Sequence, residues 1–358
     1  MTTIAKKLAQ VKPGTLLAGL DLGLDSLTCV VLNAGGQRVD RFKAPQSHDG
    51  YEYLHRRFRR LVEQQGASGV LVGMEPTNYY WKQVGAYLNQ QHLPFRLVNP
   101  YTVKRHREGD QLDRAKDDWR DAFMIADLLR TGKFNETELR TGAYAELQIG
   151  HATYWRLRLD RGRQLTLLTN SLRQVFPEMP HVFKDLTGLT AQAVLRSRPA
   201  ADQIRAGSCS EFIAHVRQAA SGQRLAVSQL RQLHTLAQDS IGLTDGRESL
   251  CFDLQASLAT LTLLDQQSES LAALLREHFR ALPEAPYLCS IEGLGEMSAL
   301  GLLAETGELA RYGSGKDLIK PTKKSAPPVS NNPKREDFLE TLPEVYNKEI
   351  IPNNAGNM

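Results

Sequence analysis

Four acidic residues lie in or next to segments that are expected to be buried, where a carboxylate is costly without a binding or catalytic role. Asp21 lies inside an otherwise apolar segment, where an unpaired carboxylate would be costly to bury. Glu75 ends a second apolar segment and precedes a proline, which stops strand pairing. Asp118 and Asp121 are three residues apart and would share one face of a helix. Such a set of carboxylates can hold divalent metal ions that act on phosphodiester bonds.

Each acid also has a simpler interpretation. Asp21 could cap a turn at a strand end, and Asp-x-Gly also occurs in the phosphate-binding loop of actin-like sugar kinases, although no glycine-rich phosphate loop follows later in this sequence. Glu75 could be a solvated residue at a sheet edge. Asp118 and Asp121 could simply stabilise the helix through their interaction with the positive end of its dipole, an effect of about 0.3–1 kcal/mol. Their shared face continues into apolar residues, so we expect both at the amino end of a buried face.

The segments around these acids predict an α/β domain. Short apolar runs predict strands at 16–22, 27–33, 38–43, 69–74 and 95–98. Helical periodicity predicts helices around 53–61, 79–88 and 117–130. Three strands joined by tight turns, followed by strands connected through helices, are the order of an RNase H-like fold.

The sequence after Gly142 predicts helices only. Apolar residues recur at spacings of three and four over 165–175 and again over 250–274, which is typical of long helices with coiled-coil character. Such helices can pack on each other or on a second subunit. A helix-turn-helix stretch is expected at 287–305.

These patterns predict an α/β plus α-helical chain in four segments. We expect a RuvC-like domain at 14–135, a helical and coiled-coil region at 136–283, the start of a helical C-terminal domain at 284–320, and a mostly disordered, proline-rich tail at 321–358.

The composition is that of a globular protein with a small positive charge. The 358 residues include 41% hydrophobic residues and carry a net charge of +4, which excludes a collagen-like, disordered or membrane-spanning chain. The four cysteines are far apart and form no Cys-x-x-Cys pair, so we expect reduced thiols in a cytoplasmic protein rather than zinc ligands. A charge this small permits a nucleic-acid partner without requiring one.

Positive residues cluster where nucleic acid could bind. The three groups are Arg56, Arg57, Arg59 and Arg60; Lys104, Arg105 and Arg107; and Arg156, Arg158, Arg161, Arg163 and Arg173. Clustered guanidinium groups bind phosphates, and Tyr154 and Trp155 beside the third group could stack on bases. The alternative is a solvated helix face. The turn with Gly293 and Gly295 could let backbone N–H groups approach a phosphate, and such turns also simply join helices.

Three motifs together resemble a known family. Gly19-Leu-Asp21, Met74-Glu75-Pro76 and Lys116-Asp-Asp118-Trp-Arg-Asp121-Ala122 are similar to the Asp-Glu-Asp-Asp (DEDD) signature of insertion-sequence transposases related to the Piv DNA invertase. The N-terminal domain of that family is similar to the RuvC Holliday-junction resolvase. The resemblance covers roughly residues 15–320, and the 291–295 turn looks like the start of the family's C-terminal transposase domain.

The resemblance implies a site-specific DNA recombinase of bacterial, nucleoid-associated type. It implies DNA and a structured guide RNA as partners, a homo-oligomer (dimer or tetramer) and no membrane. It also implies that Asp21, Glu75, Asp118 and Asp121 are catalytic and hold Mg²⁺ or Mn²⁺, while a serine in the C-terminal domain attaches covalently to DNA.

The sequence departs from the family where that serine is expected. After Lys320 the chain continues Pro-Thr-Lys-Lys-Ser-Ala-Pro-Pro instead of an apolar helix and a glycine turn, and Ser314, Ser325 and Ser330 lack the expected context. We therefore assign no nucleophile and expect a chain that is cut short or shifted in frame and catalytically incomplete. Two other functions stay open: a nucleic-acid-binding remnant without catalysis, and a RuvC-like nuclease that uses only the four carboxylates.

Overall fold

The chain folds into two units in a computed structural model. The described residues are 3–9, 11–76, 79–109, 117–135 and 139–312. The first unit ends at Leu139, and the second begins at Arg140. No helix among the described residues is long and apolar enough to cross a membrane. The proline-rich tail predicted at 321–358 lies outside the described residues.

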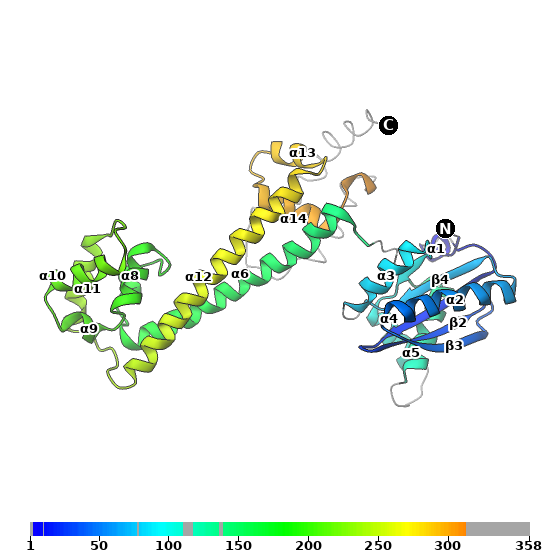
Figure 1. The fold of residues 1–358 in the computed structure, drawn as a ribbon, viewed down its shortest axis with the longest axis horizontal. Coiled ribbons are helices and arrows are strands. Elements are labelled where there is room, and N and C mark those ends of the chain that lie inside the picture. The colour runs from blue at the N-terminus through cyan, green and yellow to red at the C-terminus, as the bar shows by residue number, and fades with distance from the viewer. Residues whose placement is uncertain (1–2, 10, 77–78, 110–116, 136–138, 313–358) are drawn as a thin grey trace. The chain divides into compact units, whose positions relative to one another are not determined.

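A five-stranded mixed sheet forms the centre of the first unit (Figure 1). Its strands are β1 (Thr15–Leu22), β2 (Ser26–Leu32), β3 (Arg38–Pro45), β4 (Gly69–Met74) and β5 (Phe95–Leu97). The strand order is β3-β2-β1-β4-β5. The pairs β1–β2 and β2–β3 are antiparallel, whereas β1–β4 and β4–β5 are parallel. This topology confirms the predicted RNase H-like, RuvC-like domain.

Helices cover both faces of this sheet. They are α1 (Thr3–Ala9), α2 (His48–Gln65), α3 (Tyr80–Gln90), α4 (Pro100–Gly109) and α5 (Asp118–Arg130). Leu16, Ala18 and Leu20 of β1 pack in one cluster with α2, while Leu17 packs in another with α5. Because neighbouring side chains of a strand point to opposite faces, α2 and α5 lie on opposite sides of the sheet.

Two long helices, paired side by side, form the axis of the second unit (Figure 1). They are α6 (Gly142–Val175) and α12 (Arg247–Arg280), which confirms the two predicted long helices. Polar pairs cross between them: Arg161 with Asp265 at 2.5 Å, Gln164 with Ser257 at 2.9 Å and Ser171 with Asp253 at 2.5 Å. Because later residues of α6 meet earlier residues of α12, the two helices are antiparallel.

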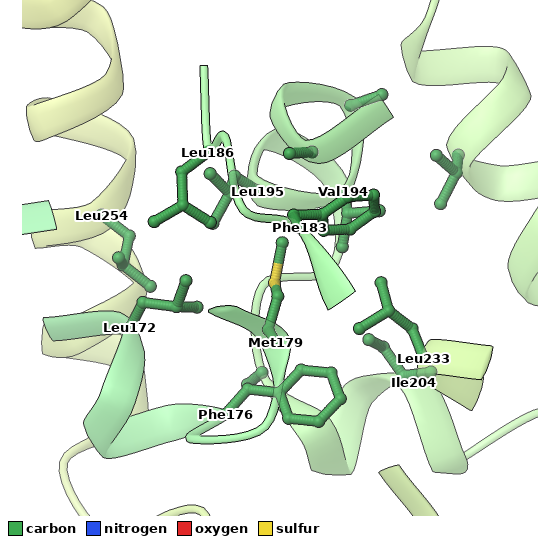
Figure 2. Packing of buried hydrophobic residues seen from close by; sticks show 14 of the residues in the cluster. Leu172, Phe176, Met179, Phe183, Leu186, Val194, Leu195, Ile204, Leu233 and Leu254 are labelled. Carbon is green, nitrogen blue, oxygen red and sulfur yellow. The ribbon is translucent and has the colours of Figure 1, made fainter. Parts of the chain in front are cut away.

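Short helices form a compact cluster between α6 and α12 in the sequence. They are α7 (Met179–Val182), α8 (Leu189–Ser197), α9 (Ala201–Arg205), α10 (Cys209–Ala219) and α11 (Val227–Gln238). Figure 2 shows Phe176 and Met179 at the centre of their core, together with Ile204 and Leu233. Leu254 of α12 belongs to the same core, so this cluster is anchored on the long helices.

The amino end of α6 and the carboxyl end of α12 hold a small helical base. It contains α13 (Ala285–Ser290), α14 (Glu296–Thr306) and the 3-10 turn η1 (Leu309–Arg311), which confirms the expected helix-turn-helix. Glu284 is buried there, with both carboxylate oxygens within 2.9 Å of the Tyr144 hydroxyl. It also accepts a hydrogen bond from the backbone N–H of Leu309 at 3.1 Å. Arg140 donates to the carbonyls of Ala304 and Glu305.

Replacing Tyr144 by phenylalanine tests the Glu284 anchor. Burial, and next the hydrogen bond to Glu284, raise the pKa of Tyr144, so the phenol keeps its proton and donates it. Without that donor a carboxylate only 4% exposed loses a partner. We expect the free energy of unfolding of the second unit to fall by about 1–3 kcal/mol in urea titrations. Tyr287→Phe is the control, since the Tyr287 hydroxyl bonds to no described residue; equal losses would contradict the anchor.

Candidate functional site

Asp21 and Glu75 stand at the ends of two neighbouring parallel strands. The register pairs Gly19 of β1 with Gly73 of β4, and each acid comes two residues after one of these glycines. Because every second residue of a strand faces the same side, each acid lies on the same face of the sheet as its glycine. The two predicted acids are therefore adjacent at one level of the sheet.

The two glycines allow α5 to lie directly on this face. A Cβ at Gly19 would stand 2.0 Å from the carbonyl oxygen of Ala122 and 2.5 Å from the backbone nitrogen of Ala126. A Cβ at Gly73 would stand 2.8 Å from the Leu129 side chain. Any side chain at Gly19 would therefore push the helix backbone away from the sheet. Sequence reasoning missed this role, although the repeated Gly-x-acid pattern in two strands was a signal for it.

The direction of α5 brings its first turn toward the strand ends. Leu17 packs with Leu128 and Leu129 near the end of α5, whereas Gly19 faces Ala122. Each step along β1 toward its carboxyl end is thus a step toward the amino end of α5. Continuing one step further, Asp21 comes level with the first turn of α5, which contains Asp118 and Asp121.

The two aspartates of α5 have different surroundings. Asp121 is buried, with 6% exposure. The prediction that Asp118 shares this burial is wrong, because its side chain is 52% exposed and forms an ion pair with Lys43 of β3 at 3.0 Å. The helix begins at Asp118, after the cap residue Asp117, so the Asp118 side chain stands at the start of its first turn.

The oxygen ligands of these four acids suit Mg²⁺ or Mn²⁺ chemically. As the described side chains stand, however, they form no group of three or more His, Cys, Asp or Glu residues that could hold a metal ion. Asp118 is engaged by Lys43, and none of Asp21, Glu75 and Asp121 is without a partner. The described conformation therefore does not assemble the four acids into a metal centre.

The first arginine group lies mostly on the far side of the sheet from the acids. Arg57 forms two hydrogen bonds with Asp40, at 2.7 and 3.0 Å, and the hydrogen bonding to Asp40 raises the pKa of Arg57. Arg56 pairs with Glu52 at 3.5 Å. Arg57 therefore links α2 to β3, whereas the pair of Arg56 lies within α2. Arg59 and Arg60 are exposed on α2, which covers the face opposite α5.

The second group lies on α4, beside α5. Val103 of α4 packs in the same cluster as α5. Lys104 and Arg105 are exposed, and the Arg105 guanidinium lies 5.6 Å from the centroid of the Tyr101 ring. The Arg107 side chain lies outside the described residues. This group is on the side of the sheet that carries the acids.

The third group on α6 divides into structural and exposed arginines. Arg161 is committed to Asp265 of α12, and this hydrogen bond raises the pKa of Arg161. Arg163 pairs with Asp160 at 3.1 Å, whereas Arg156, Arg158 and Arg173 are exposed. The predicted stacking residues are only partly exposed: the Trp155 indole N–H donates to His151 at 2.9 Å, and Tyr154 packs against the core of the base.

The glycine turn between α13 and α14 is open. Gly293 adopts the left-handed conformation at φ 81°, where other residues are strained, and Gly295 is the N-cap of α14. No neighbour lies within 4 Å of a Cβ built at either glycine, among the described residues. The turn leaves room for a phosphate and equally serves as a helix connection.

A family model matches the segment that carries the four acids. Residues 18–177 match the family model of DEDD transposases of the IS110 type, described as a transposase. The chain carries a DEDD transposase domain. The matched segment of this transposase domain includes all four acids and the whole of α6. No curated protein matches the sequence significantly.

A solved structure with a similar chain is that of RuvC from T. thermophilus in complex with a Holliday junction substrate. The identity is 16%, the alignment covers 34% of this chain and 98% of that chain, and the TM-score is 0.24. The RNase H-like assignment of the transposase domain rests on its strand order.

Gly19→Ala tests the close approach of α5. The added methyl group would collide with the helix backbone at Ala122, so we expect the free energy of unfolding of the first unit to fall by about 3 kcal/mol or more. Gly35→Ala is the control, because a Cβ there would meet only the Asn33 side chain at 3.3 Å and should change stability by less than about 0.5 kcal/mol. Urea unfolding followed by tryptophan fluorescence measures both; a tolerated Gly19→Ala would refute the contact.

Arg161→Gln and Arg158→Gln separate structural from exposed arginines on α6. Arg161→Gln removes the ion pair with Asp265. It should lower the free energy of unfolding by about 0.5–1 kcal/mol, since the pair is partly exposed. Arg158→Gln should leave stability unchanged and weaken binding of a structured RNA, with a smaller dependence of affinity on salt. Denaturant unfolding and fluorescence anisotropy measure the two effects. The reverse pattern would show that Arg161, not Arg158, meets the nucleic acid.

Proposed function

We propose that the protein is a site-specific DNA recombinase whose DEDD acids act on phosphodiester bonds with Mg²⁺ or Mn²⁺. The observation that carries the proposal is the placement of Asp21 and Glu75 on one face of adjacent strands, level with the first turn of α5. That turn contains Asp118 and Asp121. The match of this segment to a transposase model supports DNA as the substrate.

Asp21, Glu75, Asp118 and Asp121 would together hold the metal. A divalent ion held by these acids would supply Lewis-acid polarisation of a phosphoryl oxygen and would lower the pKa of an attacking oxygen nucleophile. Asp118 becomes available as a ligand only when it separates from Lys43. Lys43 is then a free ammonium group at the edge of the site, where it can bind a backbone phosphate of DNA.

A guide RNA and a second copy of the chain belong to the same proposal. Exposed Arg156 and Arg158 on α6 give a structured RNA a basic surface. The long helices also expose large apolar side chains: Ile149, Leu159, Leu167, Phe252, Leu263 and Leu274. Apolar residues exposed along paired helices favour packing against another copy, as a dimer or tetramer in the bacterial cytoplasm.

The serine half of the recombinase reaction is assigned to no residue. None of Ser314, Ser325 and Ser330 has the expected sequence context, and all three lie outside the described residues. We propose that this chain alone forms no covalent bond to DNA. Detection of a covalent protein–DNA adduct with purified protein and radiolabelled DNA would contradict this part.

A nucleic-acid-binding protein without catalysis is the second candidate. The ion pair of Asp118 with Lys43 favours it, as does the finding that the described residues form no three-ligand metal group. A nuclease that uses the four acids alone is the third, and its strand cleavage would need no serine.

Asp21→Asn separates the nuclease from the nucleic-acid-binding protein without catalysis. A nuclease that uses the four acids alone should nick branched or duplex DNA with Mg²⁺, and Asp21→Asn should lower its nicking rate by about 100-fold or more, because loss of one ligand removes several kcal/mol of charge stabilisation. Asp25→Asn is the matched control, since Asp25 is an exposed acid in the turn after β1. Nicking that survives Asp21→Asn refutes the site, and DNA binding without any nicking indicates the second candidate.

A further inference from the structure

A basic and aromatic pocket lies beside the first turn of α5, over strands β2 and β3. Its volume is about 230 Å³, and its lining includes Arg38, Arg41, Asp117, Trp119, Arg120 and Phe123. None of these residues belongs to the DEDD set or to the three arginine groups of the sequence. The pocket therefore has chemistry that the proposed catalytic site does not use.

The pocket is positively charged. Three arginines line it against one acid, and the Asp117 carboxylate already accepts a hydrogen bond from the backbone N–H of Trp119 at 3.2 Å as the cap of α5. Arg38 and Arg41 are exposed at their positions on the edge strand β3. Exposed guanidinium groups at a concave surface are well suited to bind a phosphate through paired N–H donors.

Two aromatic rings stand at the pocket one helical turn apart. The Trp119 ring lies against the Arg41 guanidinium, 5.1 Å from the ring centroid, and the Lys43 ammonium, 5.5 Å from it. Phe123, four residues later on α5, is 40% exposed. Residues four apart are neighbours on a helix surface. A partly exposed aromatic ring beside arginines is the arrangement on which an unpaired base stacks.

Lys43 joins this pocket to the acids. The same ammonium group contacts the Trp119 ring and forms the ion pair with Asp118. Asp118 and Trp119 are also consecutive residues of α5. A nucleic-acid strand whose phosphodiester lies at the DEDD acids would therefore also pass the pocket. Bases in a duplex are stacked inside and cannot reach Trp119 or Phe123, so the fitting ligand is unpaired.

We propose that this pocket binds one unpaired nucleotide of a nucleic-acid strand, next to the phosphodiester held at the DEDD acids. Arg38 and Arg41 bind its phosphate, and Phe123 with Trp119 stacks on its base. The position relative to a reacting bond rests on the proposed function, whereas binding of the nucleotide itself does not. The strand is DNA at the cleavage site or RNA from a guide, since both present the same phosphate and base.

Short single-stranded oligonucleotides of DNA and of RNA, matched in sequence, test the phosphate contacts. We expect Arg38→Gln and Arg41→Gln each to weaken binding by about fivefold or more in fluorescence anisotropy, and to reduce the salt slope by about 0.7 per lost phosphate contact. Lys133→Gln is the charge-matched control, because Lys133 is exposed beyond the other end of α5. Tighter binding of one oligonucleotide identifies the strand; variants that bind either oligonucleotide like the control overturn the proposal.

An oligonucleotide that contains 2-aminopurine tests the stacking. Phe123→Leu should weaken binding about tenfold and reduce the quenching of the 2-aminopurine emission, whereas Phe123→Tyr should retain both. Phe123 is exposed enough for these variants to fold. Unchanged quenching in Phe123→Leu would overturn the stacking role.

The two proposals can fail separately. If Asp21→Asn abolishes nicking while the arginine variants bind like Lys133→Gln, the pocket assignment is wrong and the catalytic one stands. If wild-type protein does not nick DNA but the pocket variants lose oligonucleotide binding, the pocket assignment stands and the catalytic one is wrong.

Discussion

The contact of α5 with the backbone of the central strands is the constraint on which the transposase domain depends. Gly19 and Gly73 are paired in register, and the space above Gly19 is filled by the helix backbone at Ala122. Glycine weakens a strand, because it adds chain entropy and no packing surface. Glycine nevertheless stands at two adjacent positions here. Because these glycines have no side chain, α5 lies directly on the sheet, and its first turn comes level with the ends of β1 and β4. A side chain between helix and sheet would prevent this close approach.

The first acid of α5 has positive charge beside it, and the edge of the sheet supplies that charge. Lys43 pairs with Asp118 and also lies over Trp119, while Arg41 lies over the same ring. Lys43 offsets the negative charge of Asp118. Under the proposed function, Lys43 and Arg41 would also attract the phosphates of an approaching strand, so that one edge strand, β3, would serve both the free domain and its complex with a substrate.

Helices and strands with a long, regular hydrophobic pattern could be predicted from the sequence. Features that depend on contacts between distant segments of the chain could not. Strands β1 to β5 and helices α6 and α12 were predicted, since alternation and three-four spacing report one buried face each. Helix α4 was missed because Val103 is its single buried apolar side chain among the described ones. The four acids were found by residue type, but the Gly19–Gly73 register was not, because it joins segments about 50 residues apart. The exposure of Asp118 was not predicted, because its ion pair with Lys43 joins segments 75 residues apart.

The antiparallel pair of long helices owes its register to polar contacts rather than to its leucines. Leucines at spacings of three and four permit the pair to slip by a heptad with similar apolar contact. Two polar pairs prevent such a slip: Arg161–Asp265 and Ser171–Asp253. A slip would separate these partners and leave partly buried polar groups without hydrogen bonds. Arg161 therefore serves the register, whereas Arg156, Arg158 and Arg173 of the same group are exposed.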